Sequence, residues 1–549
     1  MTVAAAGLLA AGLAACGSSP SSPSKSSAAT ELVMESSPET TITQTFNPYV
    51  NTGAPYGMGA DGLVYEPLIQ FDLAKAPTYY PYLATGYSWS NNYQSITFTI
   101  RTGVKWNNGT PFTPADVAFT YNLLMKYPAV NSAGLTMTSV TTSGDTVTLN
   151  FPTAQYGNLE QIAAVAIVPQ AIWSTVGNPA TYGDANPVGT GPYMLSSFTP
   201  QGFTFKKNPN YWQPVHVDKV YFPAYASNTG ALNALFSGQI DWTGNYIPGL
   251  QKNFVDKDPA HHHYYEASNG DESLEPNLTK WPTNQLAVRQ AINIAVNRTL
   301  LGSEGEAGLE NPVLSAGGLT LPIFSDWQSS SIGTVSATGN VAAAKKVLEN
   351  AGFTLGSNGY FQQGGQTVAL TIISPSAYTD MAEVDSIAAQ ELKAAGIDAT
   401  FQGLSVNAWN ADVADGDFQM TEHWSNGGIT PVSMYNGWLN SSLATGSAAT
   451  GDYERLNDST VDTELGTLES ATSITAQAAA LVPLEQYVAA NLPVIPLETA
   501  AEWFEYNSQH FVGWPTVANP YDSGQPSGSN NGDGTGSDEV VVLHLTPAS

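Results

Sequence analysis

Alternating apolar and polar residues predict β-strands in the first third of the chain. Ile96, Phe98 and Ile100 alternate with threonine and arginine, and residues 145–151 (DTVTLNF) repeat the pattern. Alternation with a period of two residues is typical of a strand with one buried face. Both segments are therefore predicted to be half-buried strands.

A helix is predicted to begin just after a turn at residues 107–111 (NNGTP). Thr113 is the expected N-cap, Pro114 takes the first helical position, and Asp116 completes a capping box. Residues 283–302 are expected to form a longer amphipathic helix. The side chains predicted to face inward from this helix are those of Leu286, Ile292, Ala295 and Leu300.

Three later segments share one order, in which a helix ends at a glycine and a strand follows. The glycines are Gly238, Gly352 and Gly396. Glycine commonly ends a helix because it adopts the left-handed backbone conformation at no steric cost. Units of this kind indicate α/β domains in which helices cover the faces of sheets.

Charge and aromatic content narrow the classes of ligand. The chain of 549 residues has 17 Lys and Arg against 46 Asp and Glu, which gives a formal net charge of −29. Nucleic acid is not an expected partner, because phosphate contacts need clustered cations. The 12 Trp, 26 Tyr and 19 Phe suit stacking against a partly neutral ligand, although large aromatic cores give similar counts.

The single cysteine, Cys16, follows an apolar run at residues 3–15. Such a run matches a secretory signal and is too short to span a bilayer. Residues 13–16 (LAAC) resemble a bacterial lipobox, whose cysteine is acylated and becomes the mature N-terminus. The alternative is an ordinary signal peptide with an incidental cysteine. Residues 1–16 are thus predicted to be a lipoprotein signal peptide and residues 17–29 a flexible tether.

No lysine or arginine precedes this apolar run, as expected if translation starts further upstream. After the run, no stretch reaches the roughly 18 apolar residues of a membrane helix. With one cysteine, no intrachain disulfide can form, and thiol catalysis and cysteine-ligated metals are excluded from the folded body.

Few residues suggest chemistry, and we predict no catalytic residue, no cofactor and no metal site. Three histidines, His261–His263, are adjacent, and neighbouring side chains in an extended segment point to opposite faces. A solvated loop is the preferred interpretation over a metal site. Residues 530–539 (NNGDGTGSDE) lack the spacing of a calcium loop and are expected to be a flexible loop. Paired carboxylates of a glycoside hydrolase stay an open alternative.

Several motifs together resemble one family. Residues 65–72 (YEPLIQFD) and 95–124 (SITFTIRTGVKWNNGTPFTPADVAFTYNLL) are similar to the N-terminal signature of bacterial extracellular solute-binding proteins, family 5. These proteins are the dipeptide- and oligopeptide-binding receptors of ABC importers and their relatives. The match continues, in the expected order, through residues 186–195, 206–214, 235–248, 286–298 and 491–498.

The resemblance implies an α/β, periplasmic-binding-protein-like fold: two lobes with a hinge, which close over the ligand, plus an additional domain. It also implies three discontinuous domains. Domain I would combine residues 30–72, 188–284 and 498–549, with residues 73–187 as domain II and residues 285–497 as domain III. The implied protein is a monomer that delivers its solute to an ABC permease in the membrane.

The resemblance also points to a ligand-binding loop. In peptide-binding relatives, a Trp is followed three residues later by an Asp that pairs with the α-amino group of the peptide. Trp424 matches the Trp, whereas Gly427 stands at the position of the Asp, and Glu422 is a nearby substitute. Ser425, Asn426 and the glycine backbone offer neutral hydrogen-bonding groups, which suit sugar hydroxyls.

Four further residues are candidate ligand contacts. Asn245 and Tyr246 fall on another cleft-lining segment by the same resemblance, and Tyr56 and Trp409 are weaker candidates. Packing in the core is the alternative for each aromatic residue. The sequence thus predicts an extracytoplasmic, lipid-anchored receptor for an oligopeptide or an oligosaccharide. The competing hypothesis is a secreted carbohydrate-active enzyme.

Overall fold

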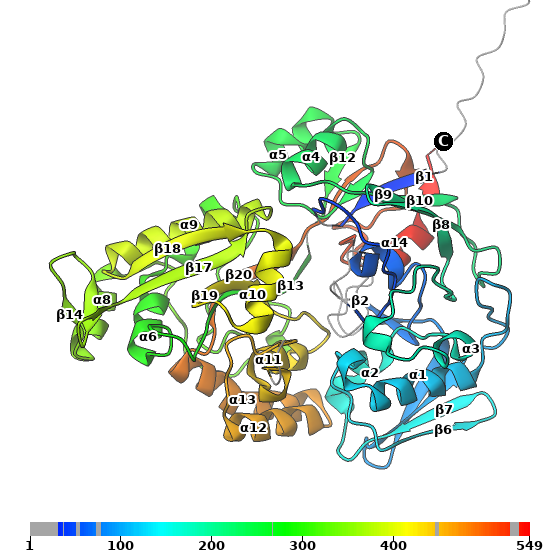
Figure 1. Ribbon diagram of the computed structural model, residues 1–549, viewed down its shortest axis with the longest axis horizontal. Helices are drawn as coiled ribbons and strands as arrows, with labels where there is room; N and C mark the ends of the chain where they lie inside the picture. Colours follow the sequence, from blue (N-terminus) through cyan, green and yellow to red (C-terminus); the bar gives the residue numbers. More distant parts are fainter. Residues whose placement is uncertain are drawn as a thin grey trace, which may run out of the picture.

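The computed structural model describes residues 31–548, except residues 37, 51–54, 73–77, 266, 445–448 and 527–536. Cys16, the predicted signal peptide and the predicted tether lie outside the described residues. Figure 1 shows two lobes. We call residues 31–265 and 503–548 the first lobe, and residues 267–502 the second lobe. The α/β, periplasmic-binding-protein-like fold is confirmed.

A mixed seven-stranded sheet forms the centre of the first lobe. Its strand order is β12-β21-β11-β1-β10-β9-β8, and β1 runs parallel to both β10 and β11. The strands are β1 (Glu31–Glu35), β8 (Tyr193–Thr199), β9 (Gly202–Lys207), β10 (Lys219–Pro223), β11 (Trp242–Thr243), β12 (His262–Tyr264) and β21 (Glu505–Asn507). The helices α4 (Asn228–Phe236), α5 (Leu250–Asn253) and α14 (Ser537–His544) belong to the same lobe (Figure 1).

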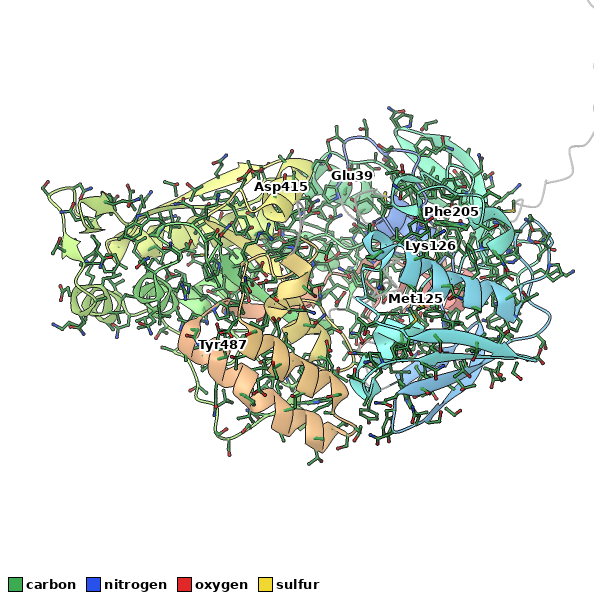
Figure 2. All side chains as sticks on the ribbon, turned by 60° about the horizontal axis from the view of Figure 1, so that its bottom comes forward. Glu39, Met125, Lys126, Phe205, Asp415 and Tyr487 are labelled. Carbon is green, nitrogen blue, oxygen red and sulfur yellow. The ribbon has the colours of Figure 1, made fainter. Side chains whose placement is uncertain are left out.

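A second, antiparallel sheet completes the first lobe, in the order β4-β5-β7-β6. These strands are β4 (Ala84–Ser90), β5 (Ser95–Ile100), β6 (Ser139–Ser143) and β7 (Thr146–Asn150), near the pair β2 (Ile69–Asp72) and β3 (Thr78–Pro81). The helices beside them are α1 (Pro114–Lys126), α2 (Leu159–Ala163) and α3 (Gln170–Trp173). Figure 2 labels Met125 and Lys126 at the end of α1, and Phe205 in the buried part of β9.

The second lobe is built on a five-stranded sheet with the order β18-β17-β19-β13-β20. Here β17 runs parallel to β18 and β19, whereas β13 is antiparallel to both of its neighbours. The strands are β13 (Ala267–Pro276), β17 (Ala369–Pro375), β18 (Asp398–Leu404), β19 (Met420–Trp424) and β20 (Ile495–Glu502). The longer helices are α6 (Leu286–Ala295), α8 (Val341–Asn350), α9 (Thr379–Ala394), α10 (Val406–Asp415), α11 (Val432–Leu439), α12 (Ser459–Ser470) and α13 (Ile474–Asn491).

The locally encoded elements are confirmed. Ile96 and Phe98 are fully buried on β5, and residues 146–150 form β7. Thr113 and Asp116 form the expected capping box of α1, with the Thr113 amide donating to the Asp116 carboxylate at 2.9 Å. Each predicted helix-ending glycine has a left-handed φ: 72° at Gly238, 84° at Gly352 and 83° at Gly396.

The prediction of one long helix over residues 283–302 is wrong. The helix α6 ends at Ala295, because the backbone of Val296 is extended and the Asn297 side chain caps a new short helix, α7 (Arg298–Leu300). Ile292 and Ala295 are buried as expected, whereas Leu286, the first residue of α6, is 37% exposed. A capping side chain inside the segment therefore overrides its amphipathic pattern.

Two loop predictions also need correction. His262 and His263 lie on β12, which pairs with β21, and His262 is buried against the Phe254 ring. The three histidines have separate polar partners, Asp258, Phe254 and Ser508, rather than one shared ion site. Residues 537–539 begin the buried helix α14, while residues 530–536 lie outside the described part of the chain.

Membrane-spanning helices were sought in the described part of the chain. None of its helices is both long enough and apolar enough to cross a bilayer.

Buried carboxyl groups gather around α14 in the first lobe. The Tyr211 hydroxyl lies 3.1 Å from Glu66 Oε1 and 3.2 Å from Glu539 Oε1, and the Trp212 indole donates to Glu66 at 2.9 Å. Burial raises the pKa of Glu66 to about 7 and raises the pKa of Glu539 well above its usual range. The other titratable groups facing Glu66 and Glu539 are Arg101, Tyr82, Asp61 and Asp538.

These shifts predict that the protein loses stability as pH rises. A carboxyl group with a raised folded-state pKa binds more protons in the folded than in the unfolded state, so its stabilising effect is complete below about pH 4.5 and lost through about pH 7. For Glu66, a shift from 4.5 to about 7 corresponds to about 3 kcal/mol. Glu66→Gln should flatten the pH dependence of the unfolding free energy, measured by denaturant titration at pH 4 to 8.

The matched control is Glu31→Gln, which makes the same charge change at an exposed residue of β1 and should leave the slope as in the wild type. Unfolding free energy that stays constant or increases over this pH range would contradict the assignment of Glu66.

Candidate ligand-binding site

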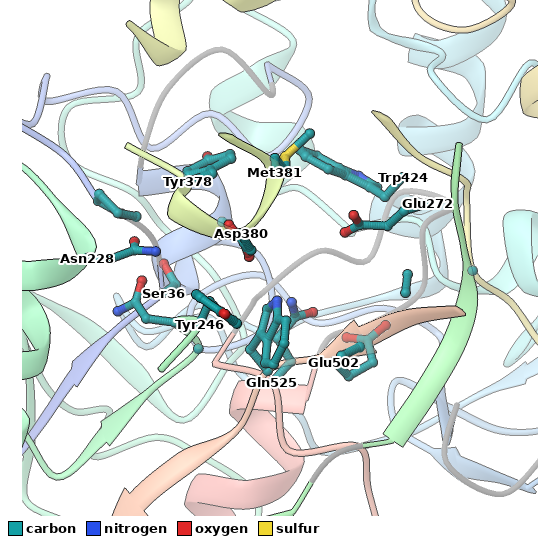
Figure 3. Close-up of a pocket in the computed structure, with 18 of the residues that line it drawn as sticks. Ser36, Asn228, Tyr246, Glu272, Tyr378, Asp380, Met381, Trp424, Glu502 and Gln525 are labelled. Carbon is teal, nitrogen blue, oxygen red and sulfur yellow. The ribbon is translucent and has the colours of Figure 1, made fainter. Parts of the chain in front are cut away.

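A cavity of about 320 Å³ lies between the two lobes (Figure 3). Residues from both sheets and from the segments between the lobes line it. The lining comprises Ser36, Pro38, Gly57, Asn228, Gly244, Asn245, Tyr246, Glu272, Tyr378, Asp380, Met381, Trp424, Ser425, Asn426, Gly427, Ala500, Ala501, Glu502, Trp503 and Gln525.

The first lobe contributes residues that follow its parallel strands. Ser36 comes directly after β1, Asn228 begins the helix after β10, and Asn245 follows β11. Because β1 is parallel to both β10 and β11, the carboxyl ends of these strands meet at one edge of the sheet. Ligands of open α/β sheets bind at such an edge.

The second lobe repeats this arrangement. Tyr378 and Asp380 follow β17, and Trp424 is the last residue of β19. The two strands are parallel neighbours, with Ile372 opposite Met420. The cavity therefore lies between the carboxyl edges of two sheets, and β13 and β20 add Glu272 and residues 500–502 to its wall.

Trp424 presents an open aromatic face at this cavity (Figure 3). Trp424 is 41% exposed, and three aromatic rings lie close to it. The ring centroid of Trp424 lies 4.6 Å from that of His423, 5.7 Å from that of Trp409 and 6.5 Å from that of Tyr378. These contacts fix the orientation of the indole before any ligand arrives.

Trp409, a predicted ligand contact, is instead a residue of the core. It is 1% exposed, it does not line the cavity, and its indole nitrogen donates to Thr421 Oγ1 at 2.8 Å. Because Trp409 lies against His423 and Trp424, it supports the open ring rather than taking its place.

The loop after Trp424 contributes three of the predicted ligand contacts to the cavity wall. Ser425, Asn426 and Gly427 all line the cavity. The Ser425 amide donates to the Asp271 carbonyl at 2.7 Å, and the Asp271 amide donates to Ser425 Oγ at 2.9 Å. This reciprocal pair holds the start of the loop on β13.

Asn245 and Tyr246 line the opposite side of the cavity. The Asn245 side-chain amide donates to Glu35 and Thr243, so part of its hydrogen-bonding capacity is already used. The Tyr246 hydroxyl donates to the Gly305 carbonyl at 2.8 Å, which links the two lobes. Tyr56 begins the short helix η1 (Tyr56–Ala60), and its side chain lies outside the described part of the structure.

The structure also supplies carboxylates that the sequence analysis missed. Glu272, Asp380 and Glu502 line the cavity, whereas Glu422, the predicted substitute acid, is fully buried and does not line it. Burial, and then the nearby Asp380 carboxylate, raises the pKa of Glu272 to about 8, and burial raises the pKa of Asp380 to about 6. None of the described residues lining the cavity is a lysine, arginine or histidine.

Two acceptor atoms at the cavity lack partners. Asn228 Oδ1 and Asp380 Oδ1 are buried, and neither accepts a hydrogen bond within the part of the chain that the structure describes. A buried acceptor without a partner costs about 1–3 kcal/mol. Both atoms are therefore poised to accept hydrogen bonds from a bound molecule.

The sequence around Asp380 contains a pattern that could have identified it as a candidate binding residue. Residues 369–375 (ALTIISP) form a buried strand, and Asp380 lies in the first turn of the helix that follows it. The junction between a parallel strand and the next helix is the expected place for a binding residue. Glu272 carried no such signal, because its position depends on strand pairing between distant parts of the chain.

Family comparison agrees with this architecture. The model of the bacterial extracellular solute-binding proteins, family 5 Middle, matches residues 78–446, so the chain belongs to this family. The predicted family membership is thus confirmed. The family and the fold are those of extracytoplasmic substrate-binding proteins of ABC importers, not those of enzymes.

Individual relatives bind different solutes. The nickel-binding periplasmic protein of Escherichia coli (strain K12) is 27% identical over 69% of this chain and 72% of its own. A Thermotoga maritima periplasmic oligopeptide-binding protein, solved with mannohexaose, gives a TM-score of 0.85 at 23% identity and covers 94% of this chain and 98% of its own. The Bacillus subtilis oligopeptide-binding protein AppA, in complex with a nonapeptide, gives 0.79 at 17% identity, covering 95% and 99%.

Proposed function

We propose that this protein is the solute receptor of an ABC importer and that it captures an oligosaccharide in the cavity between its lobes. The receptor then delivers the bound solute to a permease in the membrane. Family membership and fold support the receptor role. The proposal includes a monomeric receptor and the three-domain division stated above. Domains I and II then make up the first lobe, except that domain I also takes in residues 267–284 and 498–502, which belong to the second lobe and include β13 of its sheet.

The sugar assignment rests on one combination at the cavity. The open face of Trp424 lies in the same cavity as Asn228 Oδ1 and Asp380 Oδ1, two buried acceptors that receive no hydrogen bond from the described residues. A sugar ring offers an apolar face to an aromatic ring and hydroxyl donors at its edge. We propose that five other residues complete the site, with Tyr56 as a further candidate. These residues are Ser425, Asn426, Gly427, Asn245 and Tyr246.

A peptide is the second candidate solute, and the acidic lining favours it. Gly427 provides no carboxylate for a peptide ammonium group, but Glu272 and Asp380 bring carboxylates into the same cavity from other elements. Burying an ammonium group requires an opposite charge nearby. The two candidates therefore differ in whether an ion pair contributes to affinity.

No turnover is expected from the proposed receptor. The carboxylates of the cavity also match the residue type of a glycoside hydrolase. Incubating purified protein with cello-, xylo-, malto- and manno-oligosaccharides should show stoichiometric binding without product. Product formation would favour the carbohydrate-active enzyme instead.

Trp424→Ala should weaken oligosaccharide binding about thirtyfold, or about 2 kcal/mol, as expected for loss of an aromatic hot spot. Isothermal titration of the wild type and the variant measures this difference. The affinity of the wild type should change little between low and high salt, because a neutral ligand forms no ion pair for salt to screen.

Trp409→Ala is the matched control for the aromatic change. It should lower the free energy of unfolding by about 3–5 kcal/mol because it empties a packed core site, whereas Trp424→Ala should cost much less. The sugar assignment would be contradicted if peptides with a free amine bound tightly, in a salt-sensitive way, and lost this binding on N-acetylation. The solute would then be a peptide.

We further propose that Cys16 carries a lipid anchor on the outer face of the membrane. Cys16→Ser should release the protein from the membrane fraction of the native host without changing solute affinity, because the anchor and the cavity lie in separate parts of the chain. Fractionation followed by immunoblotting measures the release. Retention of the variant in the membrane fraction would overturn the anchor.

A further inference from the structure

Three carboxylates converge beside the proposed solute cavity. Glu272 lies on β13, Glu306 follows the short helix η7 (Leu301–Gly305), and Glu310 lies in the loop beyond it. One oxygen of each residue lies within 4.8 Å of the others. The side chains are well buried, with exposed fractions of 9%, 1% and 3%.

Glu306 is the member of this group whose charge is least satisfied. Neither of its carboxylate oxygens has a hydrogen-bond partner among the described residues, and both are buried. Glu310 accepts one hydrogen bond, from the Ala501 amide at 2.7 Å, through Oε1, and its other oxygen is buried without a partner. A buried carboxylate that lies beside two other carboxylates, and that accepts no hydrogen bond from the described residues, requires a neutralising group.

The residues around Glu306 increase the need for a neutralising group. Glu498 is the cross-strand partner of Glu272, and like charges at such positions repel. Arg298 is the cation that acts on Glu498, but its guanidinium nitrogens donate to Pro496 and Asn293. Burial raises the pKa of Glu306 well above its usual range, and the nearby Asp380, Glu272 and Glu498 carboxylates raise this pKa further. The protein therefore supplies no cation to Glu306 within the described part of the chain.

We propose that Glu272, Glu306 and Glu310 bind a hard divalent cation, of which Ca²⁺ is the best match. Carboxylates without imidazole or thiolate ligands select hard ions. Two oxygens on opposite sides of a Ca²⁺ ion are about 4.6–5.2 Å apart, since each bond is about 2.3–2.6 Å long. The three carboxylate oxygens, all within 4.8 Å of one another, are close enough together to contact one such ion.

The triad can be reached from the cavity, and the number of ligands that it supplies is compatible with Ca²⁺. Glu272 lines the solute cavity, so water and ions reach the triad from there. Three carboxylates leave several of the six to eight positions around Ca²⁺ for water or for second carboxylate oxygens. The sequence analysis predicted no metal site, and no sequence motif indicates the site that we propose.

The position of the triad connects it to the cavity and to the lobes. The Tyr246 hydroxyl donates to the carbonyl of Gly305, the residue directly before Glu306. The strands β13 and β20, which bear Glu272 and Glu498, are those by which the chain enters and leaves the second lobe. A bound cation would hold these segments together and reduce the negative charge of the cavity wall.

Terbium luminescence and calorimetry test this site directly. Tb³⁺ bound at the triad should be sensitised by excitation of nearby aromatic residues such as Tyr246, and Ca²⁺ should displace it. Titration of Ca²⁺ at pH 7.5 should show one ion per chain, with a dissociation constant of about 10⁻⁴–10⁻³ M, which is usual for extracellular modules. Glu306→Gln should weaken binding at least tenfold.

Glu304→Gln is the matched control, because it makes the same charge change two residues away at an exposed position. It should leave the binding of Ca²⁺ and Tb³⁺ unchanged, and thermal unfolding checks that both variants are folded. Equal binding by wild type and Glu306→Gln would assign the ions to the acidic surface. That result, or the lack of saturable binding to the wild type, would overturn the site.

Discussion

The pairing of β13 with both β19 and β20 is the constraint on which the rest of the site depends. This strand places Glu272 opposite Trp424 on one side and opposite Glu498 on the other. A shift by one residue would turn every side chain of β13 to the other face of the sheet. The placement of Glu272 beside Trp424, in the cavity wall and in the carboxylate triad therefore depends on one register.

The second determinant is the shortage of basic residues around buried acids. The chain has 17 Lys and Arg for 46 Asp and Glu, and many of the acids lie inside the fold. Around α14, where burial raises the pKa values of Glu66 and Glu539, bound protons neutralise the buried carboxyl groups. Beside the cavity, the proposed cation compensates them, which leaves a less charged wall for a neutral solute. The same composition thus links stability to pH in one lobe and binding to an ion in the other.

Features that depend on neighbouring residues could be predicted from the sequence, whereas features that depend on distant residues could not. The cap of α1, the strands β5 and β7 and the helix-ending glycines depend on neighbouring residues, and all were predicted correctly. The break at Asn297 was missed, because a capping side chain competes with an amphipathic pattern. Family resemblance singled out Trp424 and its loop as candidate ligand contacts, and these residues line the cavity.

The rest of the site could not be derived from local patterns. Glu272 and Trp424 are distant in sequence and meet only through strand pairing. Trp409 was a candidate contact because it is aromatic, yet α10 places it behind Trp424 in the core. Likewise, nothing near Glu306 in the sequence shows that Glu272 and Glu310 are its neighbours.

The central claim is that solute is enclosed between two lobes. In the structure, hydrogen bonds such as that from the Ile429 amide to the Glu160 carboxylate, at 2.9 Å, join the two lobes. Small-angle X-ray scattering, with and without a saturating oligosaccharide, tests closure most directly. The account predicts a smaller radius of gyration in the bound state, as in hinge closure around a ligand. An unchanged radius at saturation would contradict it.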